Sequence, residues 1–204
     1  MTLEPASLLA WIESRRSVRR FRAAPVPRPL LERILATACA APSAHNRQPW
    51  RYTVVAPGRR RRALAQAMTD EFRRDLQADG LAPADLEARV RRAGERLIEA
   101  PAAVILCCCM TDMDTYPDVR RQEAERLMAL QSVSLAGGQL LLAAHAHGLG
   151  ACWMCGPLFA PQAVRSALKL PKDWEPQALI LMGWPDVLPE PSIRRPLEDV
   201  TLWR

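Results

Sequence analysis

Three arginines and a serine stand close together near the N-terminus, in the stretch Arg15-Arg16-Ser17-Val18-Arg19. Guanidinium groups donate paired hydrogen bonds to phosphate oxygens, and a hydroxyl can add one more. Such a convergence suits a dianionic phosphate. The same residues also fit the solvated end of a helix, where the helix dipole favours cations. The stretch alone leaves both interpretations open.

A second segment of interest has the sequence APSAHNRQPW and covers residues 41–50. Pro42 ends a helical pattern, and Ser43 and Asn46 offer side-chain hydrogen bonds. Pro49-Trp50 then leads into a short apolar run that is typical of a strand. Taken alone, this segment is also typical of an ordinary capped loop.

The positions of apolar, proline and glycine residues predict helices that alternate with short strands. We expect helices near residues 7–12, 30–41, 59–79, 84–99, 119–147 and 161–170, and strands near 51–56, 102–110, 151–154 and 177–184. The two helices between residues 59 and 99 are expected at the surface, where they would cover a pocket. This pattern favours an α+β sandwich with a mixed sheet, in a single domain over residues 1–204.

The second half of the longest predicted helix, residues 133–147, is apolar on nearly every face. Such a helix is buried in a core or against a partner subunit. Within it, Ala136-Gly137-Gly138 would let another backbone approach closely. The tail from Pro185 to Pro196 holds four prolines and is expected to run extended over a surface.

Composition excludes several classes of function. The net charge is +6, and only two of the 28 basic residues are lysines, which agrees with a biased composition or with an anionic ligand. The one tight basic run, Arg59 to Arg62, is expected to begin a solvated helix, and no nucleic-acid motif accompanies it. No apolar run approaches the ~18 residues of a membrane span, and no secretory signal is expected. The cytoplasm is therefore the expected compartment.

Six cysteines in such a chain do not predict disulfides, and Cys107 to Cys109 are expected to fill a buried strand. Cys152 and Cys155 form a C-x-x-C motif, which leaves a dithiol redox site open. Against it, Gly156-Pro157 follows directly, and the next helix is expected only near Pro161. Zinc would need a second cysteine or histidine pair.

Other potential ligands are poorly arranged for a metal. His145 and His147 point to different faces of a helix, and His45 is expected to be an ordinary loop histidine, although it could reach a site. The acidic residues Asp112, Asp114 and Asp118 do not have the spacing of a calcium loop. We expect this loop to be solvated.

Several motifs in one order resemble the nitroreductase-like flavoprotein family, over about residues 12–200. They are RRSVRRF, APSAHNRQPWRYTVV, AAHAHGLGACWMCGPLF, LKLPKDWEPQALILMGWP and the closing RRPLEDV. YPDVRRQEAERLM, with the CWM and DWEP segments, is most similar to the flavin-binding half of bacterial deazaflavin-cofactor biosynthesis enzymes. The ligase half of those enzymes is absent here.

The resemblance implies a bound FMN. Arg15 and Ser17 would contact its phosphate and ribityl chain, with Arg16 beside them. Arg19 matches a cation near the pyrimidine edge of the flavin, where reduced flavin accumulates negative charge. Arg195 matches a further phosphate contact, with Arg194 as its neighbour or substitute.

The resemblance also implies a homodimer with both flavin sites at the interface and an exchanged C-terminal tail. The loop residues that would reach the partner's flavin, or shape that loop, are Pro42, Ser43, Ala44, Asn46 and Gln48. The segment that would cross the hydride-accepting edge is Trp153, Met154, Cys155 and Gly156. Backbone N–H groups of Cys155 or Gly156 would donate to the ring, although many relatives carry an acidic residue where Cys155 stands.

The implied activity is a ping-pong transfer of hydride from NAD(P)H, through FMN, to an electron-poor small molecule such as a nitroaromatic or quinone. The chain shows no convincing catalytic acid, base or nucleophile, and no G-x-G-x-x-G motif of a separate nicotinamide domain. Reduction of a deazaflavin-cofactor precursor is an alternative. A third possibility is a flavin carrier or a redox sensor that uses Cys152 and Cys155.

Overall fold

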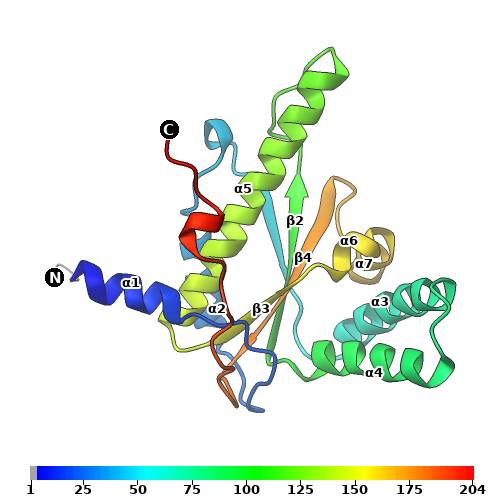
Figure 1. Cartoon of the computed structure of the whole chain (residues 1–204). Helices are drawn as coiled ribbons and strands as arrows, with labels where there is room; N and C mark the ends of the chain where they lie inside the picture. The colour runs from blue at the N-terminus through cyan, green and yellow to red at the C-terminus, as the bar shows by residue number, and fades with distance from the viewer. Residues whose placement is uncertain (1–3) are drawn as a thin grey trace.

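Four strands form one sheet in the computed structural model, which describes residues 4–204 (Figure 1). They are β1 (Trp50–Val54), β2 (Ala102–Cys109), β3 (Gly150–Met154) and β4 (Trp174–Gly183). Their order in the sheet is β1-β2-β4-β3, and each neighbouring pair is antiparallel. Every residue of β2 is buried, because helices cover both faces of the sheet. This explains why β2 is a continuous apolar run rather than an alternating one.

The helices lie in two layers around this sheet. On one face, α5 (Val119–Ala146) packs on alternate β2 residues, among them Val104 and Leu106, and α2 (Arg28–Ala38) packs against α5. On the other face lie α3 (Arg59–Ala78), α6 (Gly156–Phe159) and α7 (Pro161–Leu168), and α4 (Pro83–Glu99) packs against α3. Ile105 and Cys107 belong to the core of that second face.

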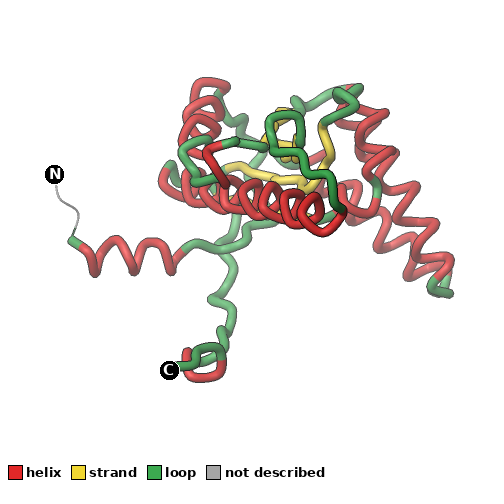
Figure 2. Tube along the Cα trace, turned by 90° about the horizontal axis from the view of Figure 1, so that it is seen from above, coloured by secondary structure: helices red, strands yellow, loops and turns green. Residues whose placement is uncertain are grey.

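Both ends of the chain extend away from this body. Helix α1 (Pro5–Ser14) and the tail after Gly183 project from it (Figure 2). The tail holds only a short 3₁₀ turn, Leu197–Asp199, and its apolar side chains are exposed, with Ile193 98% and Trp203 88% accessible. A second 3₁₀ turn, Ala44–Asn46, lies between α2 and β1.

The predicted α+β fold with a long central helix is confirmed. All four strands pair antiparallel, so the parallel part of the expected mixed sheet is limited to the isolated bridge between Ser17 and Ala151. The burial of Cys107 to Cys109 is confirmed as well. The predicted helix from Pro161 is confirmed as α7, but the sequence missed the one-turn helix α6, which begins at Gly156 directly after Cys155. Pro157 stands in its first turn, where a proline costs no hydrogen bond.

Helix α5 has one face in the core and one face open. Asp118 caps it by accepting a hydrogen bond from the Arg121 backbone N–H at 3.0 Å. By length and composition α5 is apolar enough to cross a membrane. Its buried residues, among them Ala136 and Leu140, pack in the core with α2 and the sheet, whereas Leu135 on the open face is 52% exposed.

Arg61 contradicts the expectation that residues 59–62 are solvated. Its side chain is only 1% exposed, and its guanidinium group donates to the carbonyl oxygens of Val55 and Ala100. Burial lowers the pKa of Arg61. These two carbonyls follow β1 and precede β2, so Arg61 fastens the first turn of α3 to two strand ends. The sequence gives no sign that one of four adjacent arginines turns inward.

Replacing Arg61 with methionine should destabilise the fold, because two buried carbonyl groups lose their donor. The expected loss is about 2–6 kcal/mol of unfolding free energy, at ~1–3 kcal/mol for each of the two unsatisfied groups. Urea denaturation of the purified variant measures it. Arg62→Met is the matched control, since Arg62 is exposed on the same turn. Equal stability of the two variants would show that the Arg61 contacts contribute nothing.

Candidate functional site

The arginine-serine stretch is attached to the edge of the sheet by its backbone. Ser17 forms a parallel bridge with Ala151 of β3, and the Val18 N–H donates to the Ala151 carbonyl at 3.0 Å. Val18 is buried against Gly150, where an added Cβ would lie 2.5 Å from the Val18 Cβ. The approach therefore requires glycine at position 150. It fixes the arginines beside β3.

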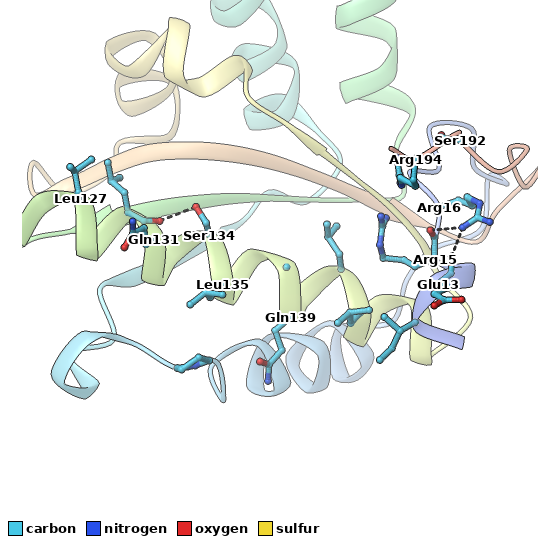
Figure 3. Close-up of a pocket in the computed structure, with 16 residues that line it drawn as sticks. Glu13, Arg15, Arg16, Leu127, Gln131, Ser134, Leu135, Gln139, Ser192 and Arg194 are labelled. Carbon is cyan, nitrogen blue, oxygen red and sulfur yellow. Dashed lines mark hydrogen bonds between the residues drawn. The ribbon is translucent and has the colours of Figure 1, made fainter. Parts of the chain in front are cut away.

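The residues that follow the arginine stretch also bind the first residues of the C-terminal tail, Trp184 to Asp186. Phe21 bridges to Pro185, the Arg22 N–H donates to the Trp184 carbonyl at 2.9 Å, and the Asp186 N–H donates to the Arg20 carbonyl at 3.1 Å. The tail consequently leaves the body next to the arginine stretch. This places Arg194 near Arg15 and Arg16 at one end of a groove (Figure 3).

This groove has a volume of about 1430 Å³ and runs along the open face of α5. Arg15, Arg16 and Arg194 are at its cationic end. Its floor is apolar and consists mainly of α5 residues; they are Leu127, Leu130, Leu135, Gly138, Leu141 and Leu142. Gln131, Ser134 and Gln139 add polar groups. The groove therefore joins a cationic end to a long apolar surface.

The charge at that end is only partly neutralised. Within residues 4–204, Arg15 and Arg194 form no ion pair, while the Arg16 guanidinium donates to the carbonyls of Glu13 at 2.6 Å and Arg15 at 3.0 Å. The Glu13 side chain lines the same groove. Two guanidinium groups thus remain free to take an anion.

The predicted site residues divide into those that line the groove and those that do not. Arg15, Arg16, Pro42 and Arg194 line it. Ser17 is held in its bridge, Arg19 is exposed, and Arg195 is exposed outside the lining. Burial raises the pKa of the Cys152 thiol, and the nearby guanidinium groups of Arg19, Arg96 and Arg15 oppose that effect. Arg19 therefore lies close to Cys152 of β3 and does not line the groove.

The loop from Pro42 to Gln48 is held rigidly by its own hydrogen bonds. The Ser43 hydroxyl accepts from the Gln48 N–H at 3.0 Å, and the Ala44 N–H donates to Ser132 Oγ of α5 at 3.2 Å. His45, Asn46 and Gln48 have φ angles of 49°, 53° and 50°. Non-glycine residues are uncommon in that region, and such strain concentrates at functional sites.

Two ion pairs, one from this loop and one from β1, reach the acidic loop before α5, and the sequence pattern does not predict either of them. Arg47 pairs with Asp114, and Arg51 pairs with Asp112 at 2.9 Å. The acidic loop is largely exposed, as expected, but two of its carboxylates also pair with arginines, and Asp118 caps α5. No group of three or more potential metal ligands occurs in the part of the chain that the structure describes.

The end of β3 presents one exposed and one buried cysteine. Cys152 is 2% exposed, whereas Cys155 is exposed and accepts a hydrogen bond from the Trp153 indole N–H at 3.2 Å. Both thiols are free. α6 follows Cys155 directly, which removes one objection to a dithiol site. However, the raised pKa of Cys152 disfavours its thiolate, so the pair is poorly suited to redox exchange.

His145 has a structural role, because its side chain packs against α1. Its ring stacks on Trp11 with 4.9 Å between centroids, and its Nε2 lies 2.9 Å from Ser14 Oγ. These contacts join the end of α1 to the end of α5. They position the chain immediately before Arg15.

Comparison with known proteins identifies the class. Residues 12–184 match the nitroreductase family. An NADH dehydrogenase of Thermus thermophilus is 37% identical, and the alignment covers 93% of this chain and 92% of that protein. A 5,6-dimethylbenzimidazole synthase of Rhodospirillum rubrum is 36% identical, and the alignment covers 93% of this chain and 86% of that protein. A solved chain from Desulfovibrio desulfuricans, described as a nitroreductase in complex with FMN, has a TM-score of 0.75 at 25% identity and covers 100% and 98%.

The chain belongs to the nitroreductase family. It is an FMN-dependent NAD(P)H oxidoreductase. The geometry fits FMN, because free guanidinium groups at one end of the groove suit a phosphate and the apolar α5 surface suits a planar ring.

Arg15→Ala and Arg194→Ala should each weaken FMN binding, since each removes one charge-assisted contact. The expected cost is about 1.5–3 kcal/mol per hydrogen bond lost. Fluorescence titration of the apoprotein with FMN measures it. Arg33→Ala, an exposed residue of α2 away from the groove, serves as the control. Unchanged FMN affinity in both groove variants would place the phosphate elsewhere.

Proposed function

We propose that the protein transfers hydride from NAD(P)H to an electron-poor small molecule, such as a nitroaromatic or quinone, by a ping-pong route. The main observation that supports this proposal is an open groove with free arginines and an apolar floor. Glu13 is the only acidic or basic residue in its lining besides the three arginines. Bound FMN supplies the hydride-accepting and hydride-donating chemistry. The protein is left with binding, orientation and electrostatic stabilisation.

Each part of the site then has a distinct task. Arg15 and Ser17, with Arg16 beside them and Arg194 or Arg195 from the tail, hold the phosphate and ribityl chain. Arg19 keeps positive charge near the pyrimidine edge, which favours the anionic reduced state. The backbone N–H groups of Cys155 and Gly156 orient the reactive edge. Trp153 and Met154 precede these groups on β3, whose pairing with β4 fixes their place.

The functional unit in this proposal is a homodimer. One protomer leaves Leu127 and Leu135 of α5 58% and 52% exposed, a patch that soluble monomers rarely show without a partner. The extended tail, with Leu202 and Trp203 exposed, supports exchange onto a second copy. The strained loop with Pro42, Ser43, Ala44, Asn46 and Gln48 would then reach the partner's flavin. Sedimentation of the FMN-loaded protein as a monomer would contradict this assembly.

The alternatives concern the acceptor rather than the site. The relative from Rhodospirillum rubrum is named as a synthase, so membership of the family does not itself select an acceptor. Reduction of a deazaflavin-cofactor precursor remains the second candidate. A sensor that uses Cys152 and Cys155 is disfavoured by the buried, raised-pKa thiol of Cys152.

The ping-pong proposal predicts parallel lines in double-reciprocal plots when NAD(P)H and a quinone are varied together. One product must leave the single groove before the second substrate enters, which produces this pattern. Anaerobic mixing with NADH or NADPH alone should bleach the flavin band, and later addition of quinone should restore it. Intersecting lines would contradict the ping-pong order. Flavin that neither nicotinamide reduces would refute the reductase proposal itself.

A further inference from the structure

Gly137 of α5 lies opposite the strand that carries the proposed flavin-contacting turn. An added Cβ at Gly137 would lie 2.1 Å from Cζ3 and 3.0 Å from Cη2 of Trp153, and 2.9 Å from Cδ2 of Leu106. No side chain fits at these distances. The sequence predicted close approach of a backbone here, whereas Gly137 instead receives the six-membered ring of the Trp153 indole.

The opposite edge of the same indole reaches the turn. The Trp153 Nε1–H donates to Cys155 Sγ at 3.2 Å. Trp153 therefore spans from α5 to the first residue beyond β3, and its ring position determines whether this bond can form. The next residue, Gly156, faces α3, where an added Cβ would lie 2.9 Å from Met68 Cε. The turn is thus packed from both sides.

The backbone of β3 is held in place by its pairing with β4. Trp153 pairs with Ile180 and Met154 with Leu179, in the register of β3 on β4. A methyl group at residue 137 would therefore be accommodated mainly by rotation of the Trp153 ring. Rotation of the ring would break its hydrogen bond to Cys155.

We propose that Gly137 is a positioning residue for the turn Cys155-Gly156: its missing side chain seats the Trp153 indole, whose N–H fixes Cys155. This inference rests on the proposed function, in which the backbone N–H groups of this turn orient the flavin. It assigns a role in the reaction to a glycine that lies in the core and does not line the groove.

A double-mutant cycle tests the inference on the FMN-loaded protein, with Gly137→Ala, Trp153→Phe and the combined variant. The measured quantities are the visible circular dichroism of bound FMN, the rate of flavin reduction by NAD(P)H, and the unfolding temperature. Phenylalanine lacks both the N–H and the second ring, so it leaves room for a methyl group at position 137. Gly94→Ala in α4 is the control, because its Cβ meets only Thr69 Cγ2, at 3.4 Å.

Trp153→Phe should slow flavin reduction about two- to tenfold, the range of one hydrogen bond. Gly137→Ala should slow it about tenfold or more, because displacements near 1 Å at a reacting centre cost up to about 100-fold. The double variant should resemble Trp153→Phe rather than show the product of both effects, since the methyl group then has no indole to displace. Gly94→Ala should match the wild type.

If Gly137→Ala does not fold, a folded double variant with the Trp153→Phe rate still supports the steric link. Wild-type reduction rates and flavin dichroism in Gly137→Ala, with only a lower unfolding temperature, would overturn the inference. The inference would also be overturned if the two substitutions slowed flavin reduction multiplicatively in the double variant. A wild-type rate of flavin reduction in Trp153→Phe would overturn it as well. Failure of the proposed function is distinguishable, because then NAD(P)H would not reduce the wild-type flavin either.

Discussion

The main-chain contact between Val18 and Ala151 is the interaction on which the candidate site depends. Val18 packs directly against Gly150, and this close approach is possible because glycine has no side chain to keep the two segments apart. Because of it, the arginine stretch lies along β3, the short strand that ends at Met154, directly before Cys155. The bridge from Phe21 to Pro185 extends this contact to the root of the tail. Three segments that are far apart in the sequence thereby meet at one edge of the sheet.

Helix α5 explains why this edge becomes a groove. Its inner face belongs to the core with α2 and the sheet, and the small residues Ala136 and Gly137 allow that close packing. Its outer face carries exposed leucines together with polar residues such as Gln131 and Ser134. In the proposed function this surface would contact both the flavin and a second copy of the chain. The cationic end of the groove then decides the direction in which a phosphorylated ligand binds.

The sequence predicted well whatever depends on local periodicity, including α3, α4, α5 and the four strands. Prediction from sequence failed where a polar side chain could either face solvent or hydrogen-bond to backbone groups distant in the chain. One arginine of four, Arg61, turns inward to carbonyls that are far apart in the chain. The salt bridges of Arg47 and Arg51 join a loop and strand β1 to the acidic loop. The family resemblance indicated the candidate site residues, but only some of them line the groove of a single protomer. The others lie outside its lining, and a contact such as Trp153 on Gly137 is not encoded in periodicity.

The central claim is that each flavin site is built from two copies of the chain, and subunit mixing tests it directly. Arg15 and Pro42 both line the groove of one protomer, whereas in the proposed dimer Arg15 of one copy and Pro42 of the other would contact the same flavin. Arg15→Ala and Pro42→Glu distinguish these two arrangements. Each variant alone should bind FMN poorly. After joint unfolding and refolding in equal amounts, about one quarter of the sites should regain wild-type affinity, because half of the dimers are mixed and each holds one intact site. No recovery, with both residues acting within one chain, would contradict the account.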